Sequence, residues 1–233
     1  MPFPRFRVPA ALAALLTATG FGLLSCSPTP DQAADAGRLP VLGFERLVPR
    51  ADGAAPDTLP PPLVPAFTLT NQDGQTITNQ TFAGKVYVTD FFFATCPSIC
   101  PKMQSELLRV YEANQANPNV LFLSHTIDPA HDSIPVLRDY AQRLGIADAS
   151  RWHFATAPHD TIFALARAYM TAAEVDKGVA GGFAHSGTFA LVDSQRRVRG
   201  LYDGMEKTEV DRLIKELPEL LKEEAAVRQT AAK

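Results

Sequence analysis

The feature that most constrains the fold of this chain is a strand-like run that leads into two cysteines. Residues 85–93, KVYVTDFFF, are rich in β-branched and aromatic residues, which predicts a buried central strand. Cys96 and Cys100 follow within ATCPSICPKM, and Pro101 stands where the first turn of a helix tolerates proline. Apolar residues then repeat at helical spacing, at Met103, Leu107 and Val110. The sequence therefore predicts that a helix opens at a pair of thiols.

Strand and helix signals alternate along most of the remaining chain. We expect strands at 119–128, 152–155, 188–193 and 197–203, and helices at 135–146, 160–170 and 206–226. Asp160 is the expected N-cap of its helix, and Pro218 should kink or restart the last one. A turn at Asp73-Gly74 predicts a hairpin over 66–78. Residues 39–48 form a weaker first strand, and the six prolines of 49–65 predict a loop or an extended arm.

This pattern predicts an α/β fold with a mixed central sheet flanked by helices. A strand that ends in a cysteine pair opening a helix is the thioredoxin arrangement. We therefore expect a thioredoxin-like fold with an N-terminal β-hairpin extension. The expected divisions are a signal peptide at 1–25, a tether and Pro-rich arm at 26–64, the folded domain at 65–226 and a disordered tail at 227–233.

The first residues of the chain have the features of an export signal. Two arginines precede the apolar run of residues 9–24, which is shorter than the roughly 20 apolar residues of a spanning helix. The run stops at LLSC, which resembles a bacterial lipobox and predicts that Cys26 is acylated and anchors the chain to a membrane. The alternative is an ordinary secreted protein in which Cys26 is discarded or free. We expect a lipoprotein of the cell envelope that faces the periplasm or the exterior.

Composition narrows the partners of the mature chain. Without residues 1–25 it carries 20 Lys and Arg against 25 Asp and Glu, a net charge of −5. A mildly acidic surface without basic runs argues against nucleic acid as a partner. Outside the cytoplasm, the two cysteines that remain either form a disulfide, bind a metal, or alternate between these two states.

The spacing of Cys96 and Cys100 favours a metal site without excluding redox chemistry. A helix N-terminus lowers the pKa of cysteine, so both thiols should ionise readily. If the segment is helical, a spacing of four places the two Cβ atoms about 5–6 Å apart on one face, which suits sulfurs that converge on one soft ion. A disulfide needs Cβ atoms nearer about 3.8 Å, which a local adjustment in the Pro-containing loop could supply.

Five histidines could provide a third ligand. His125 and His153 lie in predicted strands, His131 lies in a polar loop, and His159 lies beside a predicted N-cap, so each has a structural or solvated interpretation. His185 lies in the glycine-flanked GGFAHSGTF, just before the strand at 188–193. In a thioredoxin fold the loop before that strand faces the cysteines, so this imidazole should point at them. Two thiolates and an imidazole suit copper, with zinc as the competing assignment.

At these residues the chain resembles the Sco (SenC) family of thioredoxin-fold, copper-binding proteins that assist assembly of cytochrome c oxidase. The resemblance runs from about residue 65 to 221 and rests on residues 84–103, on HTIDPAHDSIPVLRDYA at 125–141 and on His185-Ser186, 85 positions after Cys100. It implies that Cys96, Cys100 and His185 bind copper, as Cu(I) or Cu(II), and that the cysteines form a redox-active pair.

Two residues near these motifs need separate mention. Many family members have an acidic residue just before the ligand histidine, where this chain has Ala184. Carboxylates that bond to metal-bound imidazoles tune them, so affinity does not transfer with the ligands. Asp128 could lie near the site, although a turn or cap role suits an Asp-Pro pair better.

The resemblance implies a metallochaperone that delivers copper to the copper-bearing subunit of cytochrome c oxidase, with another copper chaperone as a further partner. The alternative is a thiol-disulfide oxidoreductase that keeps the cysteines of that subunit reduced, so the chain could also be an enzyme. A structural disulfide in a membrane-tethered binding module ranks last, since so small a loop constrains the unfolded chain little.

Overall fold

The computed structural model describes residues 38–52, 54–176, 178–179 and 181–231. The predicted signal peptide and Cys26 therefore lie outside the described residues. Within the described part of the chain, no helix combines the length and the apolar character needed to cross a bilayer.

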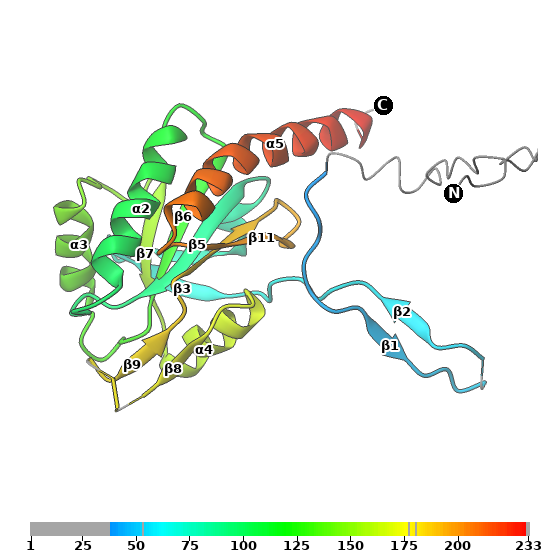
Figure 1. Cartoon of the computed structure of the whole chain (residues 1–233), viewed down its shortest axis with the longest axis horizontal. Helices are drawn as coiled ribbons and strands as arrows, with labels where there is room; N and C mark the ends of the chain where they lie inside the picture. Colours follow the sequence, from blue (N-terminus) through cyan, green and yellow to red (C-terminus); the bar gives the residue numbers. More distant parts are fainter. Residues whose placement is uncertain (1–37, 53, 177, 180, 232–233) are drawn as a thin grey trace, which may run out of the picture. The chain divides into compact units, whose positions relative to one another are not determined.

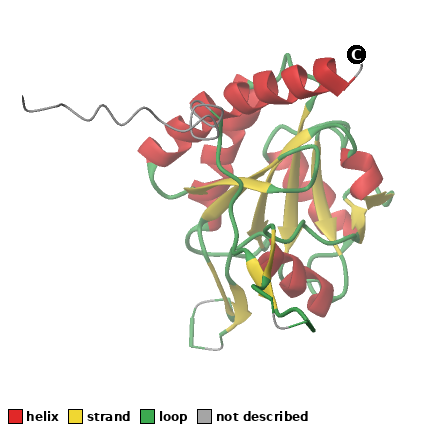
Figure 2. Cartoon of the chain, turned by 90° about the vertical axis from the view of Figure 1, so that its right-hand side faces the viewer, coloured by secondary structure: helices red, strands yellow, loops and turns green. Residues whose placement is uncertain are grey.

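A mixed sheet of seven described strands forms the centre of the domain (Figures 1 and 2). Its order is β11 (Val198–Asp203), β10 (Thr188–Val192), β5 (Val86–Phe92), β6 (Val120–Thr126), β7 (Trp152–Thr156), β3 (Thr68–Asn71) and β4 (Thr76–Thr78). β5, β6 and β7 run parallel to one another. β10 on one side and β3 on the other are antiparallel to them, and the edge strands β11 and β4 are antiparallel to β10 and β3. β5 and β6 are buried at every position, as expected for apolar central strands.

Helices cover both faces of this sheet. They are α2 (Cys100–Ala113), α3 (Ile134–Arg143), α4 (His159–Ala168) and α5 (Lys207–Ala231), with a short 3-10 helix, η1 (Asn79–Phe82). Phe92 on β5 packs against Tyr140 of α3, whereas the adjacent Phe91 packs against Tyr169, just after α4. Successive side chains of a strand point to opposite faces, so α3 and α4 lie on opposite sides of the sheet. This confirms the predicted α/β fold.

Most predicted elements are confirmed, with small shifts at their ends. The hairpin at Asp73-Gly74 is the pair β3–β4, and Gly74 adopts the positive φ that its turn needs. Asp160 lies inside the first turn of α4, and Pro158 occupies the cap position, so the predicted N-cap is wrong.

The C-terminal helix is longer than predicted. α5 continues through Pro218 as one element, so the predicted restart is wrong, and it extends over 227–231, which we expected to be disordered. Leu213, Leu217 and Leu220 are buried on both sides of the proline. This packing offsets the cost of a missing backbone hydrogen bond.

Two short ribbons lie where no hairpin was predicted. β1 (Arg46–Val48) pairs with β2 (Asp57–Leu59), so the strand predicted over 39–48 is confined to its last three residues and the Pro-rich arm contains a strand. β8 (Ala173–Val175) pairs with β9 (Phe183–His185), which places the predicted loop histidine at the end of a strand. Figure 1 labels both ribbons.

Candidate metal centre

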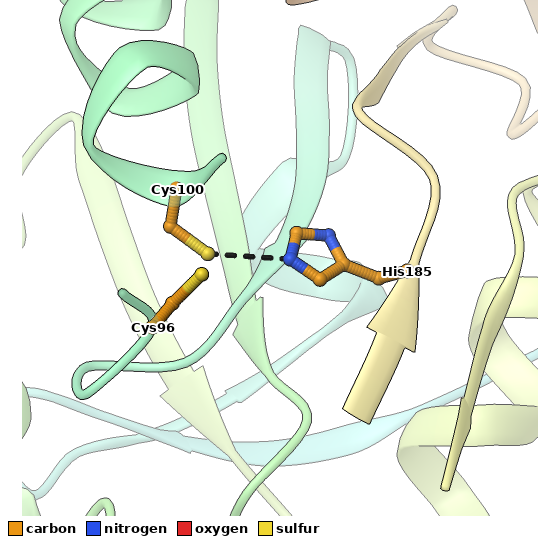
Figure 3. A group of neighbouring side chains, drawn as sticks. All are labelled: Cys96, Cys100 and His185. Atoms are coloured by element: carbon orange, nitrogen blue, oxygen red, sulfur yellow. Dashed lines mark hydrogen bonds between the residues drawn. The ribbon is translucent and has the colours of Figure 1, made fainter. Parts of the chain in front are cut away.

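The two cysteines lie at the junction between β5 and α2. Cys96 stands in the connecting loop, where its backbone N–H donates to the carbonyl of Phe93 at 3.1 Å. Cys100 is the first residue of α2, and Pro101 follows in the first turn, as predicted. Because Cys96 precedes the helix, the pair does not share a helix face. The loop brings Cys96 back toward Cys100 instead (Figure 3).

His185 reaches this junction from the end of β9. Ala173 of β8 is its partner in the ribbon. Ser186 continues this link to the start of β8, since its N–H donates to the carbonyl of Ala172 at 2.9 Å and its Oγ accepts from the N–H of Ala172 at 3.1 Å. Gly204 N–H donates to the carbonyl of Gly187 at 2.7 Å, and no Cβ would fit at Gly204. The backbone on both sides of the imidazole is therefore fixed.

The imidazole points at the sulfur atoms. His185 Nε2 lies 3.2 Å from Cys100 Sγ, and the ligand atoms of Cys96, Cys100 and His185 all lie within 4.8 Å of one another. Among the described residues, this is the one group of three or more His, Cys, Asp or Glu side chains close enough to hold a metal. Nδ1 lies 3.3 Å from the carbonyl of Ser186, to which it can only donate. The neutral ring then directs the Nε2 lone pair toward the cysteines.

The two thiols differ in acidity, against the expectation that both ionise readily. Burial opposes ionisation of Cys96, but hydrogen bonds from Cys100 and Ser98 outweigh it and lower the pKa of this thiol. Burial, and then the adjacent Cys96, raise the pKa of Cys100. Cys100 is 1% exposed and Cys96 is 9% exposed, so the helix N-terminus does not compensate for the deeper burial of Cys100. Burial also lowers the pKa of His185, which favours the neutral ring.

A buried carboxyl group lies on the α2 side of the sheet near the cysteines. Asp90 of β5 is fully buried, accepts a hydrogen bond from Gln104 Nε2 of α2 at 2.6 Å and is bonded by the hydroxyl of Ser124. Burial raises the pKa of Asp90 to about 7. Our sequence reasoning missed this residue, although a lone aspartate within the apolar run VYVTDFFF was a signal for it.

A second carboxylate that the sequence analysis missed positions the cysteine loop. Asp132 Oδ2 accepts from the backbone N–H of Ala94 at 3.0 Å and from the hydroxyl of Thr126. This ties the residue two positions before Cys96 to the loop after β6. Asp128 instead bonds His131 at 2.7 Å and caps the turn through its backbone, which fits the turn role considered for it.

The other histidines lie outside the group of three. His125 is fully buried and stacks on Phe91 with ring centroids 4.7 Å apart. His153 contacts the amide of Asn71 at 3.3 Å, and His159 packs on Phe163. His131 is largely exposed. Their structural or solvated interpretations match these positions.

An open pocket of about 490 Å³ gives access to the site. It is lined by Phe93, Cys96, Ser98, Ile99, Val179, Phe183, Ala184 and His185. Ala184 is one of these lining residues. Many members of the family that the sequence resembles have an acidic residue at this position, and Ala184 leaves this part of the pocket wall without a charge. A larger cleft, of about 540 Å³, lies beside η1 and has neither a thiol nor an imidazole in its walls. We therefore assign the chemistry to the smaller pocket.

The arrangement supports two kinds of chemistry. Two sulfurs and a nitrogen with an open side can hold a soft ion and exchange it. Both cysteines are free thiols, and a thiol of lowered pKa beside one of raised pKa can form and break a disulfide.

Comparison with solved structures shows related folds. A SCO1/SenC family lipoprotein from Bacillus anthracis superposes with a TM-score of 0.62 at 26% identity, covering 68% of this chain and 94% of that one. BsSco, described with a disulfide switch and as a member of the Sco family of cytochrome c oxidase assembly proteins, gives 0.59 at 27% identity, over 67% and 91%. Yeast Sco1 with copper bound gives 0.53 at 25% identity, over 68% and 90%. The thioredoxin-like fold is thereby confirmed.

The family model described as SCO1/SenC matches residues 55–222, which include both cysteines, the buried strands and the β8–β9 ribbon. This match spans well over half of the sequence, and the sequence resemblance pointed to the same motifs. The chain belongs to the SCO1/SenC family.

Proposed function

We propose that this protein binds one copper ion through Cys96, Cys100 and His185 and delivers it to the copper-bearing subunit of cytochrome c oxidase. The observation that carries the proposal is the imidazole of His185, which lies 3.2 Å from Cys100 Sγ with its free lone pair toward the sulfurs. The copper-bound state of yeast Sco1 and the description of BsSco as an oxidase assembly protein support the cargo and the partner.

The donor set suits copper better than zinc. Thiolates select Cu(I), and imidazole accepts copper in either oxidation state. Structural zinc takes four protein ligands, and the described residues offer three at this place. A site of three ligands with an open side lets a thiolate of the partner enter and displace the ligands one at a time.

The three ligands have different parts in loading. Cys96 has the lowered pKa and the greater exposure, so its thiolate is the first donor available. Cys100 has a raised pKa and must lose its proton as the ion arrives, which makes binding release a proton. His185 needs no proton loss, because burial lowers its pKa and keeps the ring neutral.

A second function is thiol-disulfide exchange with the cysteines of the same subunit. The contrast between Cys96, which is less deeply buried and more acidic, and Cys100, which is more deeply buried and less acidic, favours it. The first would attack a disulfide and the second would resolve the mixed disulfide. The disulfide switch described for BsSco supports this alternative.

We place the protein on the outer side of a membrane, held by an acylated Cys26. The lipobox-like LLSC at 23–26 supports this placement. So does the description of the Bacillus anthracis relative as a lipoprotein.

Copper titration of the reduced protein and its His185→Ala variant tests the chaperone function. We expect the variant to bind copper more than about 100-fold more weakly, because a ligand is lost outright, while two free thiols are still counted and still form a disulfide. The matched control is His159→Ala, an imidazole on α4 outside the site, which should bind within about twofold of the parent. Equal affinity in the His185→Ala variant would refute the ligand assignment.

The redox alternative is tested without metal. If exchange is the function, the reduced apo protein should reduce a disulfide substrate while its own Cys96 and Cys100 form a disulfide, and His185→Ala should keep most of that activity. If the metal-free protein reduces no disulfide, the alternative is wrong.

A further inference from the structure

Exposed apolar side chains gather in one segment, residues 41–63, which we call the arm. Nine large apolar side chains of the described residues are exposed, and six of them belong to the arm: Val41, Phe44, Leu47, Val48, Leu59 and Leu63. Phe44 is the extreme case, at 88% exposure. Scattered apolar residues on a surface need no explanation, but six of them within one segment of 23 residues make that segment a candidate interaction site.

The arm buries neither of its faces. Leu47 lies opposite Thr58, whereas Leu59 lies opposite Arg46 on the other face of the β1–β2 ribbon, and every residue of both strands is exposed. An isolated two-stranded ribbon is marginally stable in water. The arm therefore has apolar side chains available on both sides for another surface.

The two feet of the arm are fixed to the domain. The N–H of Leu42 donates to the carbonyl of Val198 at 2.8 Å, and the N–H of Val64 donates to the carbonyl of Arg196 at 2.9 Å. Arg199, whose side chain is 2% exposed, donates to the carbonyls of Pro40 and Leu39. Both ends of the arm are thus fixed beside the start of β11.

The charges of the arm suit a phospholipid. Arg50 is neutralised within the ribbon by Asp52 at 2.9 Å and Asp57 at 3.3 Å. Arg46 at the foot and Arg167 near the end of α4 are both exposed, and neither forms an ion pair with another described residue. They line one pocket of about 360 Å³ with apolar walls that include Leu42, Phe44 and Met170. Guanidinium groups beside apolar walls match a phosphate headgroup above acyl chains.

We propose that the arm inserts into the headgroup and upper acyl region of the membrane that carries the lipid anchor. This rests on the acylation of Cys26 in the proposed function. Fourteen residues lie between Cys26 and Val41, so the chain between them can span no more than about 50 Å. The tether keeps the arm close to the bilayer, and the arm adds a second contact to the lipid.

The test places a fluorophore on the arm of the acylated chain in vesicles. Trp152 is the native tryptophan and is fully buried, so it gives a constant background. In vesicles of phosphatidylcholine with brominated acyl chains, emission of the Phe44→Trp variant should be quenched at least about twofold more than that of the parent. Val227→Trp, an exposed apolar site on α5, is the matched control and should match the parent.

The same vesicles separate the two proposals. Flotation of the parent with lipid reports the anchor alone, and a parent that stays in solution overturns the anchor and the arm together. If the parent floats but Phe44→Trp and Val227→Trp are quenched equally, the proposal that the arm inserts into the membrane is wrong, while the lipid anchor stands. The arm would then bind a protein partner. Adding phosphatidylglycerol should deepen the quenching, and Arg46→Gln with Arg167→Gln should remove that increment. Copper binding by the soluble form is independent of each result.

Discussion

The β8–β9 and β1–β2 ribbons are both antiparallel pairs of three-residue strands, yet only β8–β9 is packed against the core. β9 is half buried, and its Phe183 meets Phe93 with ring centroids 5.5 Å apart. Gly181, in the turn before β9, lies so close to the same ring that a Cβ would approach it to 2.7 Å. Among the described residues, β1 and β2 have no such aromatic neighbour, and every residue of both strands is exposed. Both ribbons have the same antiparallel pairing. Packing of the surrounding side chains therefore decides whether a ribbon can hold a functional side chain such as His185 in place.

The largest expected effect concerns the loss of stability when an ion pair is removed at the feet of the arm or at its tip. Arg199 is buried and bonds both Asp193 at 3.1 Å and Glu223 at 2.8 Å, whereas Arg50 bonds two exposed carboxylates. Arg199→Ala should lower the free energy of unfolding by about 2–4 kcal/mol, because buried charge-assisted hydrogen bonds are lost, although Arg197 still bonds Asp193 and Arg38 still bonds Glu223. Arg50→Ala should cost far less, because solvent screens an ion pair between exposed side chains. Urea denaturation of both variants measures the contrast, and similar losses would contradict it.

A second contrast concerns how stability depends on pH. Buried ionisable groups lie in the core next to the cysteine site, whereas the arm has no such core. Asp90 has a folded-state pKa of about 7, above its unfolded value near 3.8. Its contribution is therefore complete below the unfolded value and is lost as pH rises toward 7, by about 1.4 kcal/mol per pH unit. His125 and His153, whose pKa values burial lowers to about 3 and about 4, change stability in the opposite sense as pH falls below 6.5.

The Asp90→Asn variant isolates the contribution of this carboxyl group to the pH dependence of stability, because His125 and His153 are unchanged in it. Relative to the variant, the parent should lose stability steadily between pH 4 and pH 7, as measured by urea denaturation at each pH. Asp57→Asn, which removes a carboxylate from the exposed arm, is the matched control and is measured at the same pH values. A parallel pair of curves for Asp90→Asn and the parent would show that Asp90 ionises normally.

The smallest expected effect compares two glycines of similar geometry. Gly181 has φ +90° beside Phe93, and Gly43 has φ +125° with Pro61 2.8 Å from an added Cβ. Alanine at either position is strained by about 1–2 kcal/mol. Gly181→Ala should also weaken copper binding about tenfold, because it lifts the turn before β9 off the ring that supports it. Gly43→Ala should leave copper affinity within about twofold of the parent. An equal loss of copper affinity in both variants would show that the turn before β9 has no special role in holding the site.

The sequence predicted the elements that depend on local pattern. Apolar periodicity located the parallel strands and the helices, and the cysteine and histidine motifs indicated which residues would meet. It could not predict the helix that passes through Pro218, because Leu217 and Leu220 stabilise it through contacts made only in the folded chain. The raised pKa of Cys100 was missed for the same reason, since burial against distant residues outweighs the local helix effect.

Neither short ribbon could be predicted from pattern. Three-residue strands carry too little periodicity to be distinguished from loops. β8 and β9 are separated by seven residues, and β1 and β2 by eight. Each depends on a register that only three-dimensional pairing fixes. His185 was placed near the thiols because of the strand that follows it, and the ribbon that holds it came from the structure alone.

The position of Arg199 has a mechanical consequence. Its guanidinium joins the chain entering at Leu39 and Pro40 to Glu223 on the last helix, and Arg38 bonds Glu223 as well. The registry of β10 with β11 puts this junction near Val192, whereas His185 precedes the other end of β10. A pull transmitted from the N-terminal side would load the C-terminal helix first, and Cys96, Cys100 and His185 would keep their geometry while the body of the protein moved.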